Sequence, residues 1–177
     1  MNAIVVYESI YGNTRAIAEA IADGLGGAPV VSPDALPADA AQAELLVVGG
    51  PTHIHGMATA RSRRAAVEGP HATATATAAP AEPALRDWLA DLPRADDARA
   101  AAFDTRLDKA EWVTGAASHG IAKRLRRHGY TVVDTASFLV TGNEGPLKDG
   151  ELERARLWGT ELAASALVAL SDAEMTS

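Results

Sequence analysis

Residues Ala3–Leu25 decide the fold, and they read AIVVYESIYGNTRAIAEAIADGL. The stretch opens with a continuous apolar run rich in β-branched residues, which predicts a short strand buried on both faces. Apolar residues then recur every four positions, at Ile17, Ile21 and Leu25, which predicts an amphipathic helix. The loop Glu8–Thr14 lies between them. It is placed where an anion would meet the first turn of that helix.

The rest of the chain repeats this alternation of strand and helix. It predicts strands at 3–7, 29–32, 45–50, 99–103 and 131–141, and helices at 14–25, 82–92, 115–128 and 151–170. Such alternation is typical of an α/β fold with a parallel sheet covered by helices on both faces. We expect a single domain over residues 1–170, a flexible insertion around 56–83 that contains an alanine–threonine repeat, and a frayed tail at 171–177.

Composition excludes several classes of function. The net charge of -7 disfavours a nucleic-acid-binding protein, which usually has a basic face. Because there are no cysteines, thiolate catalysis, cysteine-ligated zinc and iron–sulfur clusters are excluded. The sequence shows neither a membrane span nor a signal peptide, so we expect a cytoplasmic protein.

The loop after the first strand carries the chemistry of a phosphate site. Ser9 and Thr14 offer hydroxyl donors, Gly12 lets the backbone approach a ligand closely, and the helix supplies free N–H groups with a positive dipole end. The motifs of P-loop nucleotide hydrolases and of dinucleotide-binding folds are both missing from the sequence. A phosphate monoester held by uncharged donors is therefore predicted.

This loop resembles the phosphate loop of flavodoxins. The form S-x-Y-G-N-T over Ser9–Thr14 is most similar to that of the flavodoxin domains of flavodiiron proteins. Three later stretches agree with this family: Gly49–Thr52 with the start of the second flavin loop, Trp112–Ala116 with the region after the third, and Gly145–Leu147 together with Arg154–Gly159 with the C-terminal helix. The resemblance covers nearly the whole chain apart from 56–83.

The resemblance implies a five-stranded parallel sheet of order 2-1-3-4-5, a short-chain flavodoxin and non-covalently bound FMN. It also implies redox partner proteins, a reductase and an acceptor, that the sequence does not identify. The cofactor-binding residues it predicts are Ser9, Ile10, Tyr11, Gly12, Asn13, Thr14, Pro51, Thr52, His53, Ile54, His55, Gly56, Asp104, Thr105, Trp112 and Gly115. No side chain is expected to act in catalysis or to hold a metal.

The second and third loops depart from the family pattern. The second loop lacks the usual aromatic residue and carries His53 and His55, which either contact the flavin ring or are solvated loop histidines. Trp112 is the aromatic candidate in the third loop, and its other interpretation is a tryptophan of the core or of a helix start.

Three functions follow from these observations. The first is an FMN-binding electron carrier. The second is an FMN-dependent NAD(P)H:quinone-type reductase, and the third is a flavodoxin-fold binding module that has lost the flavin. The basic cluster Arg61, Arg63 and Arg64 is either a solvated patch or a site for an acidic partner or a phosphate-bearing substrate. The run Lys123–Arg127 is interpreted as the exposed face of a helix, and the oligomeric state is left open.

Overall fold

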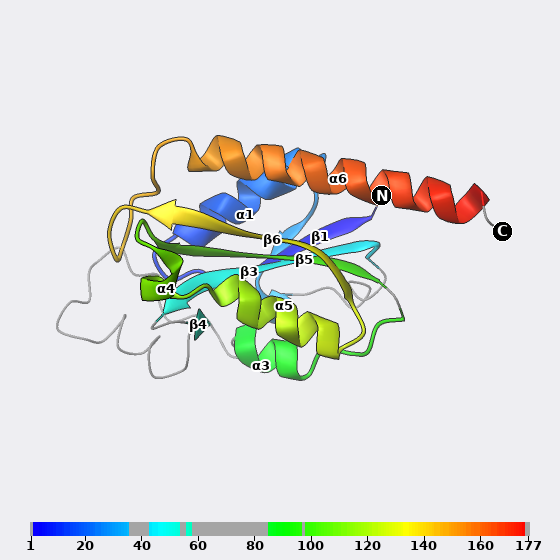
Figure 1. The fold of residues 1–177 in the computed structure, drawn as a ribbon, viewed down its shortest axis with the longest axis horizontal. Coiled ribbons are helices and arrows are strands. Elements are labelled where there is room, and N and C mark those ends of the chain that lie inside the picture. Colours follow the sequence, from blue (N-terminus) through cyan, green and yellow to red (C-terminus); the bar gives the residue numbers. More distant parts are fainter. Residues whose placement is uncertain (1, 36–42, 54–55, 58–84, 97, 176–177) are drawn as a thin grey trace.

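A central sheet between two layers of helices makes up the fold (Figure 1). The computed structural model describes residues 2–35, 43–53, 56–57, 85–96 and 98–175. The elements are β1 (Ala3–Tyr7), α1 (Asn13–Gly24), β2 (Val30–Val31), the 3-10 turn η1 (Pro33–Ala35), β3 (Leu45–His53), β4 (Gly56–Met57), α3 (Leu85–Ala90), β5 (Arg99–Leu107), α4 (Glu111–Thr114), α5 (Ala117–Arg127), β6 (Thr131–Val140) and α6 (Glu151–Met175).

The sheet has the predicted topology. Its strands are ordered β2-β1-β3-β5-β6, and each of these neighbours pairs in parallel. This confirms the five-stranded parallel sheet of order 2-1-3-4-5 with helices on both faces. The short strand β4, which was not predicted, folds back antiparallel onto the end of β3. The strand order reverses between β1 and β3, and in such sheets ligands bind beyond the carboxyl ends at this reversal.

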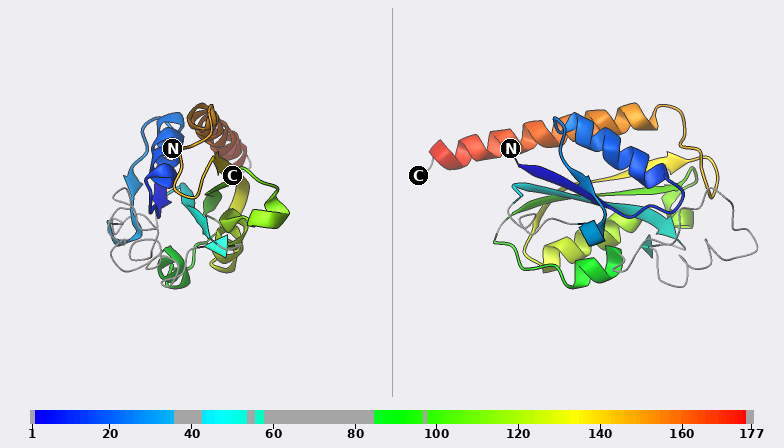
Figure 2. Two further views of the ribbon diagram at one scale, coloured as in Figure 1. Left: turned by 90° about the vertical axis from the view of Figure 1, so that its left-hand side faces the viewer. Right: turned by 180° about the vertical axis from the view of Figure 1, so that it is seen from behind.

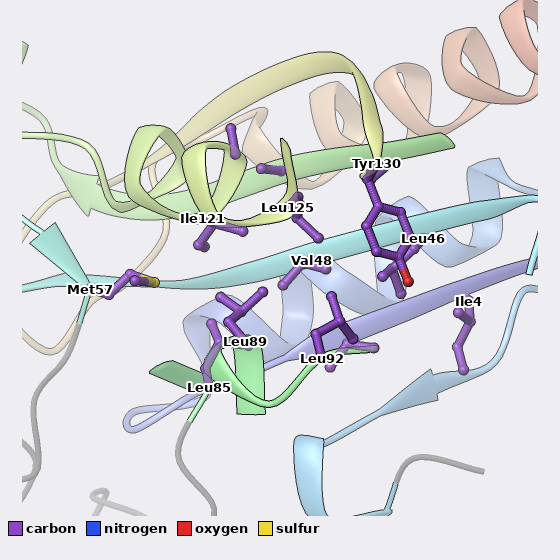
Figure 3. Close-up of a cluster of buried hydrophobic side chains, with 14 of the residues drawn as sticks. Ile4, Leu46, Val48, Met57, Leu85, Leu89, Leu92, Ile121, Leu125 and Tyr130 are labelled. Carbon is purple, nitrogen blue, oxygen red and sulfur yellow. The ribbon is translucent and has the colours of Figure 1, made fainter. Parts of the chain in front are cut away.

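Each central strand is buried on both faces because its side chains alternate between two cores. Val5 and Val47 face α1 and α6, whereas Ile4 and Leu46 face α3 and α5. Figure 2 shows the two helical layers on opposite sides of the sheet. Figure 3 shows the core on the α3 and α5 side, with Met57 at the end of the cluster nearest β4.

The contact between α1 and α6 depends on two glycines. A Cβ atom on Gly24 would lie 2.0 Å from the carbonyl oxygen of Arg156, and one on Gly159 would lie 2.3 Å from that of Ile21. The two helices therefore approach with backbone against backbone. In the sheet beneath them, Gly49 leaves the space that the ring of Phe103 fills, since a Cβ there would lie 2.1 Å from the ring.

The outer edge of β6 is covered by side chains of the first turn of α6. The carbonyl of Ser137 accepts a hydrogen bond from Arg154 Nη2 at 2.5 Å, and the N–H of Leu139 donates to Glu151 Oε2 at 2.8 Å. These bonds occupy backbone groups that would otherwise be available for pairing with another strand.

Several predicted boundaries were wrong. β5 continues from Phe103 to Leu107, so Asp104 and Thr105 belong to the strand, and β3 continues to His53. α6 reaches Met175 rather than residue 170. In the first turn of this helix Leu152 is 49% exposed, although an apolar residue there suggested a place on the buried stripe. Most of the predicted insertion at 56–83 lies outside the described residues, as does the cluster Arg61–Arg64, so both stay predictions.

Candidate functional site

The loop between β1 and α1 has the backbone geometry of an anion cradle. Gly12 has a φ of 86°, and nothing lies within 4 Å of where its Cβ would be, so this residue borders open space. No side chain caps α1, and the first-turn N–H groups of a helix have no helical carbonyl to bond. Ser9 Oγ accepts the N–H of Gly12 at 3.1 Å, which keeps its own O–H available as a donor.

Side-chain hydrogen bonds connect the start of α1 to strand β5 and to the loop after β6. The hydroxyls of Thr14 and Thr105 are 2.8 Å apart, and both residues are buried. Asn13 Nδ2 donates to the carbonyl of Glu144 at 2.8 Å. The structure thus brings together the predicted residues of the first loop and the end of β5. It adds the loop after β6, which the prediction of the site had left out.

Side chains from β3 and β5 hold the first turn of α5. Thr52 Oγ1 accepts the N–H of Ala117 at 2.9 Å, and Asp104 Oδ2 accepts that of Ser118 at 2.8 Å. Burial raises the pKa of Asp104 above its ordinary value of 3.8, while the hydrogen bonds of Ser118 and Ser137 and the charge of Arg106 act in the opposite direction. Thr52 and Asp104, both predicted as cofactor-binding, therefore also fix the position of this helix.

The remaining predicted residues differ in accessibility. The side chain of Ile10 is buried, so it can offer only its backbone to a ligand. Tyr11 is partly buried, and burial followed by the charge of Glu144 raises its pKa. Trp112 is 86% exposed in the first turn of α4, so it is not a core residue, whereas the helix-start interpretation agrees with its position. Gly115 ends α4 with a φ of 70°.

The second loop is only partly described. Pro51 and the backbone of His53 belong to β3, and Gly56 pairs with His53 in the turn back to β4. Ile54 and His55 lie outside the described residues. The roles predicted for the two histidines therefore stay predictions.

Two features of this edge were missed from the sequence. Glu8 is 4% exposed, and its Oε2 accepts the N–H of Leu85 at 2.9 Å, which connects the end of β1 to the start of α3. Gly145 packs so closely on the first loop that a Cβ there would lie 2.7 Å from the Asn13 side chain. For Glu8, the position of an acidic residue directly after an apolar strand was a signal for a buried hydrogen-bonding role. For Gly145, nothing in the neighbouring sequence indicates its contact with Asn13.

A family model for flavodoxins matches residues 5–158, which is most of the chain. The chain belongs to the flavodoxin family. The match includes the first loop, β3, β5 and the first turns of α6. No curated protein matches this flavodoxin in sequence.

Solved structures agree with the fold. A flavodoxin from the domain Archaea is 25% identical, covers 94% of this chain and 99% of its own, and has a TM-score of 0.58. A flavodoxin, WrbA-like protein from Agrobacterium tumefaciens is 22% identical, with 93% and 96% covered and a TM-score of 0.55. Oxidised flavodoxin 1 from Bacillus cereus is 18% identical, with 91% and 96% covered and a TM-score of 0.62. These are structures to which this flavodoxin is similar.

Two searches of the described residues gave no candidates. None of the helices there combines the length and the hydropathy that a bilayer-spanning segment needs. No group of three or more histidine, aspartate or glutamate side chains in the same part of the chain is arranged to hold a metal ion.

Proposed function

We propose that this flavodoxin binds FMN non-covalently and transfers electrons between proteins. The observation that carries the proposal is the cradle at the β1/β3 reversal, where Gly12 borders open space beside the uncapped start of α1. A phosphate monoester fits these donors: the N–H groups of the first turn, and the hydroxyls of Ser9 and Thr14. No cation belongs to residues 9–14, so uncharged donors and the helix dipole would carry the binding.

The flavin ring would lie between the second and third loops. Thr52 and Asp104 stand at the ends of the two strands that border this space, and Trp112 is exposed on the segment that follows β5. When bound, FMN supplies one-electron or two-electron transfer. The protein binds and orients the ring and sets the electrostatic field around it. None of its side chains is assigned a role as nucleophile or proton donor.

Titration of the flavin-free protein with FMN tests this function directly. Flavin fluorescence should change until a single site is saturated. Thr14→Val should weaken FMN binding at least tenfold, because it removes a hydroxyl donor from the phosphate site and leaves Thr105 without its hydroxyl neighbour. The loss of a hydrogen bond to a charged group costs about 1.5–3 kcal/mol. Thr160→Val, which removes a hydroxyl far from the site on α6, is the matched control and should bind as the natural protein does.

The FMN titration, followed by addition of NAD(P)H, also distinguishes the electron carrier from the other two functions. A protein that stays colourless and ignores added FMN would contradict the proposal and favour a binding module without flavin. If NAD(P)H alone bleaches the bound flavin within the mixing time of a stopped-flow instrument, the protein is a reductase rather than a carrier. Slow bleaching, together with rapid exchange of electrons with a redox partner protein, is the result we expect.

Four further parts of the interpretation stay predictions. They are the relation to the flavodoxin domains of flavodiiron proteins, the redox partner proteins, the cytoplasmic location and the domain limits of 1–170. The contacts of His53 and His55 with the ring are also proposed: replacing either by alanine should change the pH dependence of the flavin potential.

A further inference from the structure

Three arginines belong to the two helices that cover the face of the sheet opposite α1 and α6. Arg86 belongs to α3, and Arg124 and Arg127 belong to α5. The run Lys123–Arg127 was predicted to be an exposed helix face, but Arg124 is partly buried, as is Arg86. Two of these arginines are therefore partly covered by their neighbours rather than fully solvated.

The two partly buried guanidiniums meet at the same place. Arg86 Nη2 donates to the carbonyl of Met57 at 3.4 Å, and Arg124 Nη1 donates to that of Gly120 at 3.1 Å. A Cβ on Gly120 would lie 3.8 Å from both Arg124 Nη1 and Met57 Cε, so the side chains of Arg124 and Met57 flank the same glycine. Both arginine side chains therefore lie next to β4, the strand that follows the second flavin loop.

Among the residues that the structure describes, this positive charge has no acidic partner. Within the described residues, no carboxylate forms an ion pair with Arg86, Arg124 or Arg127. The Nε atom of Arg86 is buried and has no hydrogen-bond acceptor there. Burial and then the charges of Arg86 and Arg127 lower the pKa of Arg124.

An anion removes both costs of this arrangement. Partly buried cations are unfavourable unless they are paired, and like charges side by side repel. Guanidinium groups bind phosphate through two parallel hydrogen bonds, and a phosphate dianion can accept from more than one of them. The chain as a whole has a net charge of -7, whereas residues 123–127 of α5 include four cations.

We propose that Arg86 and Arg124, together with the exposed Arg127 that follows Arg124 by three residues on α5, form a binding site for the phosphate group of a small molecule, next to the second flavin loop. The site is separate from the cradle at Gly12 and does not depend on flavin binding. Its phosphate comes either from the free ion or from a nucleotide, and the chemistry of recognition is the same for both.

The experiment is a calorimetric titration with inorganic phosphate and, separately, with ADP. FMN is present at saturation so that the first loop is filled, and sodium chloride keeps the ionic strength constant. We expect saturable binding that weakens at least tenfold in Arg124→Gln and in Arg86→Gln. Arg126→Gln removes the same charge from the exposed side of α5 and should bind as the natural protein does. Tighter binding of ADP than of phosphate identifies a nucleotide as the source, and equal binding identifies the free ion.

Two outcomes would overturn the proposal. One is an absence of saturable binding by either probe. The other is an equal loss in Arg126→Gln and Arg124→Gln, which would show diffuse electrostatic attraction rather than a site. If Arg124→Gln does not fold by circular dichroism, Arg86→Gln and Arg127→Gln decide. The flavin spectrum reports FMN binding in the same samples. If the protein binds no FMN, the loss in the arginine variants still tests the arginine site, since the first loop is unchanged in all of them.

Discussion

The same substitution, glycine to alanine inside a helix, should have opposite effects at two positions of this protein. Gly159 lies in α6 where it crosses α1, and Gly120 lies in α5 with only ordinary contacts. Alanine is favoured over glycine in a helix interior by about 1 kcal/mol. That gain is present in both variants, so the difference between them measures the contact between the helices.

The cost at Gly159 follows from the distances. Its Cβ would lie 2.3 Å from the carbonyl oxygen of Ile21 and 3.1 Å from the carbon, and heavy-atom contacts of a Cβ essentially never fall below 3.0 Å. The helices must separate by about 0.7 Å, and a gap of that size forfeits roughly a quarter to a half of each dispersion contact across it. Overpacking of this kind costs about 1–3 kcal/mol. Less the gain from the helix preference, we expect Gly159→Ala to lose up to about 2 kcal/mol of stability.

Gly120→Ala should instead gain about 0.5–1 kcal/mol, since the nearest atoms to its Cβ are 3.8 Å away and belong to flexible side chains. Urea unfolding followed by circular dichroism gives both values. For a chain of this size each kcal/mol corresponds to about 2–4 °C in Tm. If Gly159→Ala is as stable as Gly120→Ala, the close approach of α1 and α6 is not a feature of the protein in solution.

Three further predictions concern polar groups. Thr14→Val alone should lower the free energy of unfolding in urea by about 1–3 kcal/mol, because it leaves the buried hydroxyl of Thr105 unpaired. The double variant Thr14→Val, Thr105→Val should be nearly as stable as the natural protein. Additive losses in the two single variants and the double variant would contradict this. The pKa of Asp104 is raised in the folded state, so above pH 3.8 the folded state binds more protons than the unfolded state. The free energy of unfolding therefore falls as the pH rises through this window. Asp104→Asn should flatten this pH dependence of stability, measured as urea midpoints between pH 4 and 8. Arg154→Ala exposes the carbonyl of Ser137 on the edge strand and should promote self-association in sedimentation velocity, while a strictly monomeric variant would refute the protective role of this contact.

The fold was predictable because the residue types of its central strands indicate that both faces of each strand are buried. The run from Ala3 to Tyr7 is apolar throughout, which happens when both faces of a strand are covered, and the structure covers both. The helix after it was equally clear, since Ile17 and Ile21 recur at the helical period and are fully buried. Local pattern and tertiary position agree in these segments.

The end of β5 was not predictable by the same rule. The predicted strand covered the apolar run 99–103 and ended at Asp104, yet Asp104 is fully buried and paired with β6. Its acceptor role at the start of α5 makes that burial tolerable, and this role depends on a helix 14 residues later in the chain. A hydrogen bond between distant segments leaves no periodic signal, and the same holds for Thr14 with Thr105.

Arg124 illustrates the reverse error. A run of five residues with four cations at 123–127 is usually a solvated face, and for Lys123, Arg126 and Arg127 that interpretation agrees with their exposure. In α5, however, Arg124 directly precedes the buried Leu125, and its guanidinium turns back toward Gly120 and β4. Composition alone cannot separate one inward-turned arginine from three neighbours that face water.

The two ends of the proposed flavin site differ in how far they are organised before a ligand binds. At the phosphate end, Thr14, Asn13 and Ser9 are already held by hydrogen bonds to neighbouring loops or to their own loop. At the ring end, Trp112 is 86% exposed, so stacking it on a flavin requires ordering a side chain that the protein alone leaves in water. Ordering a side chain opposes binding by about 0.5–1.5 kcal/mol. The phosphate end therefore supplies affinity at little cost, and the ring end is where the strength of flavin binding can be adjusted.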